Sequence, residues 1–329
     1  MPVDIEVMLP AYGDRPMLLE AIESVLAQDD PDWRLTIIDD AAANGGDILA
    51  DWIRNRVDPR IRYLTNPRRL GINRNFQRCV DECSADWVIV LGDDDRLLPD
   101  CISRIRRTVS ELPDTSWVHT GARVIDGAGR PILPMADWVK RRGTPRVDVR
   151  REMRGEELAV SLLVGNWMYF PSCAFRRDVL QRHGFRPGYD IVMDLDLFLR
   201  ILLDDGVCVL LEQPGIAYRR HAASVSSSKA DDGSRFTEEA VYFQQMATAM
   251  AQVGWPRAAA AARRHWTSRL HALAKVPPTL AARNRKGAAA LVRAAFATSR
   301  TPAPWSLDGR SATGVLMSPE LRQAPGPEA

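Results

Sequence analysis

Two kinds of feature are missing from this sequence: long hydrophobic runs and paired cysteines. No stretch of about 18 consecutive apolar residues occurs in the 329 residues, which argues against a transmembrane helix. None of the five cysteines belongs to a C-x-x-C pair, so buried thiols in a reducing compartment are expected. The first residues show no signal-peptide pattern. We therefore expect a cytoplasmic protein, either free or peripheral at the inner face of the membrane.

The sequence also lacks a G-x-G-x-x-G signature after its first predicted strand, and it lacks a large excess of charge. The missing glycines argue against a dinucleotide-binding dehydrogenase or methyltransferase of the Rossmann type. The formal net charge of +2 gives no reason to expect a nucleic-acid partner, and we expect none. The hydrophobic content of 46% is ample for a large core.

Apolar runs and helical patterns alternate in the first 112 residues. The strand-like runs are residues 5–9, 33–38, 61–64 and 87–91, and a helical pattern follows each of them. This rhythm predicts an α/β fold with a mostly parallel central sheet and helices on both faces. The rhythm changes afterwards. We expect residues 134–153 to form a mobile basic loop that, with residues 166–173, shapes part of the site.

Three adjacent carboxylates follow the most apolar of these strands. Gly92 ends the strand, and Asp93, Asp94 and Asp95 come directly after it. Ligands of open α/β sheets bind at the carboxyl ends of the strands, and carboxylate oxygens suit Mg²⁺ or Mn²⁺ that also binds substrate phosphates. The cluster therefore predicts a metal–diphosphate site. The alternative is an acidic surface turn, because Asp is common in turns.

The last third of the chain is rich in alanine and is expected to be helical over residues 236–300, with breaks at 254–256 and 277–278. No acid occurs between Glu239 and Asp308, whereas ten Lys and Arg lie in that interval. One interpretation is a set of solvated helix faces that pack on the acidic part of the protein. The other is peripheral contact of residues 257–300 with anionic lipid or a phosphorylated acceptor.

Several segments of the chain resemble motifs of the family 2 glycosyltransferases, which have the glycosyltransferase A fold. The resemblance covers roughly residues 4–230 and rests on the order and spacing of the motifs. These segments are Pro10-Ala11-Tyr12, the helix 17–28, Ile37-Ile38-Asp39-Asp40, residues 66–75, Asp93-Asp94-Asp95, Asp194-Leu195-Asp196-Leu197-Phe198-Leu199-Arg200 and Tyr218-Arg219-Arg220-His221.

The resemblance implies a role for each donor-side residue. The loop Pro10-Ala11-Tyr12 would hold the nucleotide base, and Asp40 would accept a hydrogen bond from N3–H of uracil or thymine. Arg74 would meet the diphosphate. Asp93 and Asp94 would hold ribose or sugar hydroxyls or assist the metal. Asp95 would bind Mg²⁺ or Mn²⁺, and His221 would complete the metal or diphosphate site, unless it is a bystander in its loop.

The resemblance also implies that Asp194 is the catalytic base, with Asp196 as a structural acid facing Arg200. An Asp at this point can alternatively cap a helix N-terminus. The sequence departs from the family pattern at Met193, where Glu is usual. It also departs at Gly13, where Asn is usual, and at Ala41-Ala42, where Gly-Ser is usual.

The resemblance implies an inverting glycosyltransferase that moves a sugar from a nucleoside diphosphate sugar to a hydroxyl acceptor. UDP or dTDP would be the carrier, and the acceptor would be a sugar, a lipid-linked sugar or a small molecule. Residues 1–230 would form the catalytic domain, with a nucleotide-binding half at 1–112 and an acceptor half at 113–230. A helical extension at 231–300 and a disordered tail at 301–329 would follow. The alternatives are a sugar nucleotidyltransferase and a non-catalytic nucleotide-sugar binding or scaffold protein.

Overall fold

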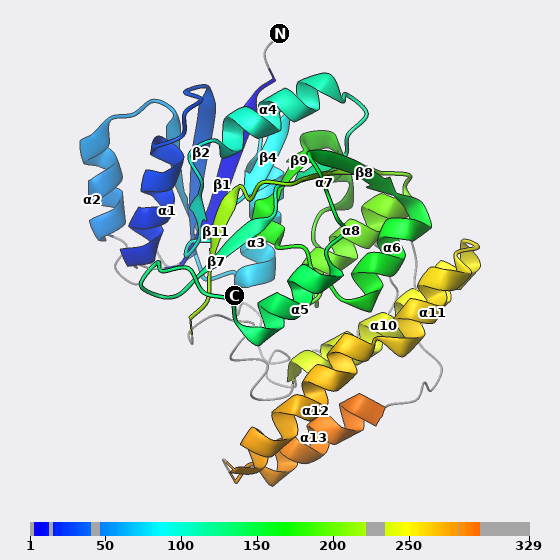
Figure 1. The fold of residues 1–329 in the computed structure, drawn as a ribbon. Coiled ribbons are helices and arrows are strands. Elements are labelled where there is room, and N and C mark those ends of the chain that lie inside the picture. Colours follow the sequence, from blue (N-terminus) through cyan, green and yellow to red (C-terminus); the bar gives the residue numbers. More distant parts are fainter. Residues whose placement is uncertain (1–2, 13–15, 41–46, 222–233, 282, 297–329) are drawn as a thin grey trace, which may run out of the picture.

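The structure is a computed structural model that describes residues 3–12, 16–40, 47–221, 234–281 and 283–296. Its centre is an eight-stranded sheet in the order β3-β2-β1-β4-β9-β6-β10-β8 (Figure 1). The first four strands are parallel, which confirms the α/β prediction. They are β1 (Ile5–Ala11), β2 (Trp33–Asp39), β3 (Ile61–Thr65) and β4 (Trp87–Val90).

Helices cover both faces of this parallel half. Successive side chains of a strand point to opposite faces of the sheet, and both faces of β1 carry apolar side chains. Val7 belongs to one core cluster, with α1 (Pro16–Leu26) and α4 (Cys101–Glu111), whereas Met8 belongs to the other, with α3 (Ile72–Glu82). The helix α2 (Asp47–Arg56) follows β2. All five cysteines are buried and free, as the sequence predicts.

The second half of the sheet is mixed. Strand β9 (Cys173–Arg176) is antiparallel to both β4 and β6 (Trp117–His119), β10 (Val207–Leu211) is parallel to β6, and β8 (Arg150–Arg154) is antiparallel to β10. A three-stranded sheet is formed by β5 (Arg96–Leu97), β11 (Ile216–Arg219) and β7 (Ala122–Ile125). The helices here are α6 (Gly155–Val164), α7 (Arg177–His183) and α8 (Met193–Leu203), with a short 3₁₀ helix, η2, at Phe170–Ser172.

The expectation of a mobile loop at 134–153 is wrong. This segment contains the helix α5 (Met135–Gly143) and the start of β8. Helix α5 is fixed by Asp137, whose buried carboxylate accepts hydrogen bonds from Tyr169 Oη at 2.8 Å and from Arg220 at 2.7 and 3.1 Å. These partners lie more than 30 residues away in sequence, so a local pattern of Gly, Pro and basic residues gives no sign of them.

The C-terminal helices are α10 (Ser234–Gln252), α11 (Pro256–Arg264), α12 (Trp266–Ala281) and α13 (Arg285–Phe296). Figure 1 shows α12 and α13 projecting beyond the rest of the molecule. The predicted break at 254–256 is confirmed, but the break at 277–278 is wrong, because α12 continues through Pro277 and Pro278. The carbonyls that lose their helical N–H donors there belong to Leu273 and Ala274, and both residues are exposed. Among the described residues, no helix is long and apolar enough to cross a membrane.

Candidate functional site

The carboxyl ends of β1, β2 and β4 bring the first predicted site residues together. The N–H of Asp40 donates to the carbonyl of Ala11 at 2.8 Å, so the ends of β1 and β2 are adjacent. On the other side of β1, the N–H of Tyr12 donates to Asp93 Oδ2 at 3.3 Å. The Arg69 guanidinium lies 4.3 Å from the centre of the Tyr12 ring. Pro10 and Ala11, expected in a loop, are instead the last two residues of β1, and Tyr12 follows them directly. The end of β1 is therefore in contact with both acidic segments.

Asp40 is buried, and its carboxylate already holds the loop that leads into α3. Its Oδ1 accepts hydrogen bonds from Asn66 Nδ2 at 2.6 Å and from the N–H of Leu70 at 2.7 Å, and its Oδ2 accepts one from the N–H of Gly71 at 2.8 Å. A carboxylate has about four acceptor positions. One position on Oδ2 therefore remains for a ligand.

The start of α3 places Arg74 on the surface. Its neighbour Asn73 is buried, and Asn73 Nδ2 donates to the carbonyls of Arg186 at 3.0 Å and Tyr189 at 2.6 Å. Arg74 itself is exposed. Its guanidinium is thus available to an anionic ligand, but the structure does not bring it into contact with the acids after β4.

Asp95 is buried with one carboxylate oxygen left without a hydrogen-bond partner. Oδ1 accepts from the N–H of Arg219 at 2.8 Å, whereas Oδ2 has no partner within the described part of the chain. Burial and the nearby negative charge of Asp94 raise the pKa of Asp95 well above its usual range. A Cβ added at Gly92 would lie only 2.8 Å from Asp95 Oδ2 and 3.0 Å from Asp94 Oδ1. Glycine therefore leaves room between these two carboxylates.

The structure pairs the predicted metal ligand His221 with Asp94, the neighbour of Asp95 in sequence. His221 Nε2 lies 2.7 Å from Asp94 Oδ2, so its direct partner is Asp94 and not Asp95. No group of three or more His, Cys, Asp and Glu side chains is arranged for a metal ion within the described ranges. An unpartnered buried oxygen next to a second carboxylate nevertheless fits a hard divalent cation that takes its other ligands from substrate phosphates.

Arg219 is a site residue to which the sequence assigned no role. Its side chain is fully buried, and Nε donates to the carbonyl of Asp94 at 2.7 Å. The remaining nitrogens donate to the carbonyl of Gly127 at 3.0 Å and to Glu20 Oε2 at 2.6 Å. One arginine therefore fixes the acidic loop to β11, to α1 and to the turn after β7. The only sign of this role in the sequence is that Arg219 stands directly before Arg220 and His221 in the same motif.

Asp194 lies in the first turn of α8, but it is not the N-cap residue, which is Val192. Its Oδ2 accepts from Asn166 Nδ2 at 3.1 Å and its Oδ1 from the N–H of Leu195 at 2.7 Å. Burial raises the pKa of Asp194, and the nearby charge of Lys140 partly opposes this shift. A carboxylate with a raised pKa and a fixed orientation is suited to general base catalysis.

Lys140 on α5 is a second residue that the motifs did not indicate. Burial and the charge of Arg220 lower its pKa to about 8, and its Nζ lies 4.5 Å from the centre of the Tyr169 ring. Lys140 influences Asp194 only because Asp137 anchors α5 beside the site. The predicted structural pair is confirmed, since Arg200 Nε donates to Asp196 Oδ2 at 2.8 Å.

A third such residue, Glu238, comes from α10. Its Oε1 accepts hydrogen bonds from three consecutive N–H groups directly before α8, those of Asp190 at 3.1 Å, Ile191 at 2.7 Å and Val192 at 3.0 Å. This negative charge therefore lies at the N-terminal end of α8, where the helix dipole favours it. The family pattern has Glu at the position of Met193, and here a carboxylate from the C-terminal extension reaches the same short segment.

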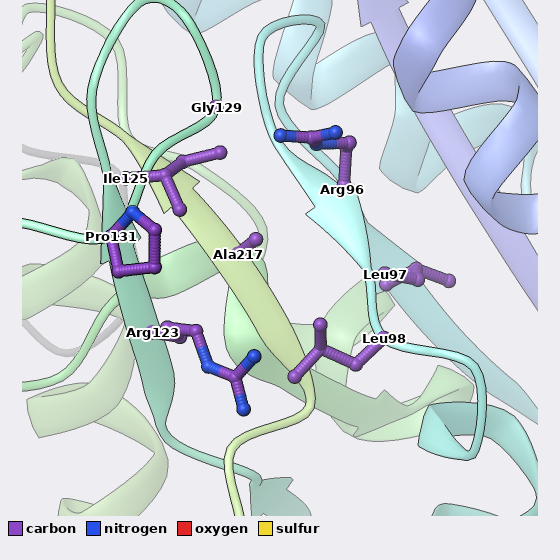
Figure 2. A pocket seen from close by; sticks show the side chains of 8 residues that line it. All are labelled: Arg96, Leu97, Leu98, Arg123, Ile125, Gly129, Pro131 and Ala217. Carbon is purple, nitrogen blue, oxygen red and sulfur yellow. The ribbon is translucent and has the colours of Figure 1, made fainter.

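A separate hollow lies over the three-stranded sheet (Figure 2). It is lined by Arg96, Leu97, Leu98, Arg123, Ile125, Gly129, Pro131 and Ala217, and it contains none of the predicted site residues. Gly13, Ala41 and Ala42, where the chain departs from the family pattern, lie outside the described residues, as do the last residues of the His221 motif and the tail 301–329.

Comparisons with known proteins give a family match and several relatives. The family model of glycosyl transferase family 2 matches residues 6–184, which is more than half of the chain. An uncharacterized protein of Mycobacterium tuberculosis is 27% identical over 236 residues, which are 68% of this chain and 69% of that protein. WcaA of Escherichia coli, named for colanic acid biosynthesis as a glycosyl transferase, is 22% identical over 61% of this chain and 67% of its own length.

Two solved structures have a similar fold. Residues 1–349 of TarS from S. aureus superpose with a TM-score of 0.60 at 12% identity, over 89% of this chain and 81% of TarS 1–349, and the same protein is known in complex with UDP-GlcNAc. A mannosyltransferase of Pyrobaculum calidifontis, solved with GDP-Man and Mn²⁺, gives a TM-score of 0.53 at 15% identity, over 88% of this chain and 79% of that one. At such identities the likeness shows the fold alone.

Proposed function

The chain belongs to glycosyl transferase family 2, and from that premise we propose that it transfers a sugar from a nucleoside diphosphate sugar to a hydroxyl group with inversion at the anomeric carbon. The observation that carries the proposal is the oriented carboxylate of Asp194, whose pKa is raised by burial. The relative WcaA is named for colanic acid biosynthesis, which supports a role in the synthesis of polysaccharides or other glycoconjugates.

The donor in this proposal binds at the carboxyl ends of β1, β2 and β4. Tyr12 and Asp40 lie where the proposal places the base, and the remaining acceptor position of Asp40 suits an imide N–H such as N3–H of uracil or thymine. UDP or dTDP is therefore the proposed carrier. The complex of TarS with UDP-GlcNAc supports a uridine carrier, whereas the GDP-Man complex of the archaeal mannosyltransferase makes guanosine the base to test against.

The residues present fit a divalent cation, Mg²⁺ or Mn²⁺. Asp95 Oδ2 is the buried oxygen without a hydrogen-bond partner in the described residues. Asp94, which is hydrogen-bonded to His221, is its neighbour in sequence. Such an ion would offset the negative charge of the departing nucleoside diphosphate. The archaeal structure with Mn²⁺ supports this assignment. Arg74 on the surface of α3 is the proposed protein cation for the diphosphate.

In the proposed mechanism, Asp194 Oδ2 receives the proton of the acceptor hydroxyl while the hydroxyl oxygen attacks the anomeric carbon. The bond between that carbon and the diphosphate oxygen breaks in the same step, and the nucleoside diphosphate leaves. Asn166 and the N–H of Leu195 hold the carboxylate in one orientation, so that the base does not have to be immobilised during the reaction. Lys140 keeps the base ionised at a lower pH than burial alone would allow, because its positive charge favours the carboxylate form. The acceptor is a sugar, a lipid-linked sugar or a small molecule.

The test is calorimetric titration of UDP, dTDP and GDP with and without Mn²⁺, on wild type, Asp95→Ala and Asp194→Asn. We expect one nucleotide to bind in a metal-dependent manner, binding to be lost in Asp95→Ala, and binding to persist in Asp194→Asn. The last variant should lose roughly 10²- to 10⁴-fold in transfer rate, the usual contribution of general base catalysis. Folded protein that binds none of the three nucleotides would refute the proposal.

A further inference from the structure

The outer face of α12 is apolar and turned away from the protein. This face consists of Trp266, Leu270, Leu273, Pro277 and Leu280, whose spacing of three and four residues places them on one side of a helix. Trp266 is 60% exposed, Leu270 61% and Leu280 50%. Monomeric soluble proteins rarely expose such a continuous apolar stripe without a partner.

The opposite side of α12 shows that this orientation is fixed. Ala272 and Thr279 are buried there, and the His271 ring packs edge-on against Phe236 of α10 with centroids 5.2 Å apart. Ser268 Oγ donates to Glu239 of α10. These contacts bind α12 to α10 through one side, so the apolar stripe on the other side is the surface that remains for another molecule.

Exposed positive charge lies just before and just after α12, and this part of the sequence contains no acid. Arg263 and Arg264 precede the stripe and are exposed, and Arg283, Arg285 and Lys286 follow it and are exposed as well. No Asp or Glu occurs anywhere from residue 240 to residue 307. A partner for this surface must therefore be apolar in the middle and anionic at the rim.

Helix α5 presents the same combination a second time. Its exposed residues include Met135, Trp138 and Val139, and Arg141 and Arg142 are exposed in its last turn. In Figure 1, α5 lies between the central sheet and the C-terminal helices, and α12 lies further down, beyond α10. Two unrelated segments that both combine exposed Trp with exposed Arg are typical of a protein that lies on a membrane interface.

We propose that the outer face of α12, assisted by α5, binds the surface of a bilayer that contains anionic phospholipid. The apolar side chains enter the headgroup region, and the arginines and lysines at both ends of α12 meet the lipid phosphates. A protein partner would need an acidic rim around an apolar centre at two separate sites, whereas an anionic bilayer offers that chemistry everywhere. The helix lies on the membrane and does not cross it.

This binding would place the proposed base beside the bilayer. Thr267, next to Trp266, donates to the carbonyl of Val164 at 2.7 Å, and Asn166 two residues further on holds Asp194. On the other side, α5 carries Lys140, whose charge acts on the same carboxylate. This consequence rests on the proposed function, and it favours an acceptor whose hydroxyl is held at a membrane surface. The bilayer contact itself does not depend on sugar transfer.

The experiment is flotation of the full-length protein with vesicles, in the absence of donor and acceptor. One set is phosphatidylcholine alone, and the other contains phosphatidylglycerol as well. We expect binding to the second set only, weakened by salt. The double variant Leu270→Gln/Leu273→Gln should bind at least roughly 10-fold more weakly for each leucine. The triple variant Arg283→Gln/Arg285→Gln/Lys286→Gln should lose roughly 100-fold, at about fivefold for each cation near an anionic surface.

The matched control is Val149→Gln, which changes an exposed apolar residue directly before β8 and should bind as wild type. Circular dichroism checks that each variant is folded. Wild type that fails to bind phosphatidylglycerol vesicles, or a leucine variant that binds as well as wild type, would overturn the proposal. So would a concentration-dependent dimer in sedimentation that Leu270→Gln abolishes, because the face would then belong to a second copy of the chain. Failure here leaves nucleotide binding intact, so it is distinguishable from failure of the proposed function.

Discussion

Glu238 offers the sharpest test of how the C-terminal extension contributes to the site. Its carboxylate accepts three backbone hydrogen bonds from residues 190–192, and Asp194 follows two residues later. The substitution Glu238→Ala removes the single oxygen, Oε1, that accepts all three hydrogen bonds. A hydrogen bond to a charged group is worth about 1.5–3 kcal/mol when it is buried, but Glu238 is only half-buried and water replaces part of the loss. We therefore expect each hydrogen bond to contribute about 1 kcal/mol, so the loss of all three costs residues 190–192 about 3 kcal/mol.

That free energy is lost locally, at the segment that leads to Asp194, the proposed base. We expect kcat of Glu238→Ala to fall by roughly 10- to 100-fold, since a displacement of about 1 Å costs roughly 100-fold in a positioned reaction. Glu238→Gln retains a neutral acceptor oxygen and should recover most of the activity, because neutral hydrogen bonds are worth about half as much as charged ones. Steady-state kinetics on purified variants measures both effects.

A double variant separates positioning from a merely structural role. If Glu238 acts through Asp194, then Glu238→Ala added to Asp194→Asn should cost little further in kcat, because the group that it positions is already inactive. The matched control is Glu152→Gln, which removes an exposed carboxylate on β8 and should leave kcat unchanged. Wild-type kcat in Glu238→Ala, or a fully additive loss in the double variant, would refute the reasoning.

Three further predictions concern single residues of the site. Lys140→Met removes a positive charge that lowers the pKa of Asp194, so the acid limb of the pH profile of kcat/KM should move to higher pH; an unmoved limb would contradict this coupling. Gly92→Ala should weaken metal-dependent nucleotide binding roughly 10-fold, because its Cβ would crowd the two neighbouring carboxylates, whereas Gly127→Ala, with nothing within 4 Å, should not. Arg219→Met should lower the free energy of unfolding by about 3 kcal/mol in urea, because it leaves carbonyl oxygens without charged donors; an unchanged midpoint would contradict this.

Much of the fold follows from local pattern. The alternation of apolar runs and helical periods in the first 112 residues predicts the parallel strands β1 to β4, because strand and helix periods depend on neighbours only a few residues away. The same reasoning places Asp40 and Asp93 at strand ends, and strand ends of a parallel sheet meet at one edge. The pair of Asp196 and Arg200 is likewise a local property, at one helical turn of separation.

The sequence by itself therefore determined the α/β architecture, the positions of the acids along the chain, and the absence of negative charge between Glu239 and Asp308. Only the tertiary structure decided what each charged group faces. In the structure, His221 contacts Asp94 and Arg219 donates to the carbonyl of Asp94. Glu238 of α10 accepts hydrogen bonds at the start of α8. These partners are separated by 46 to 127 residues in sequence. Which side of a helix is buried, and which buried oxygen lacks a partner, depends on packing between distant segments, and the spacing of residues along the chain does not carry that information.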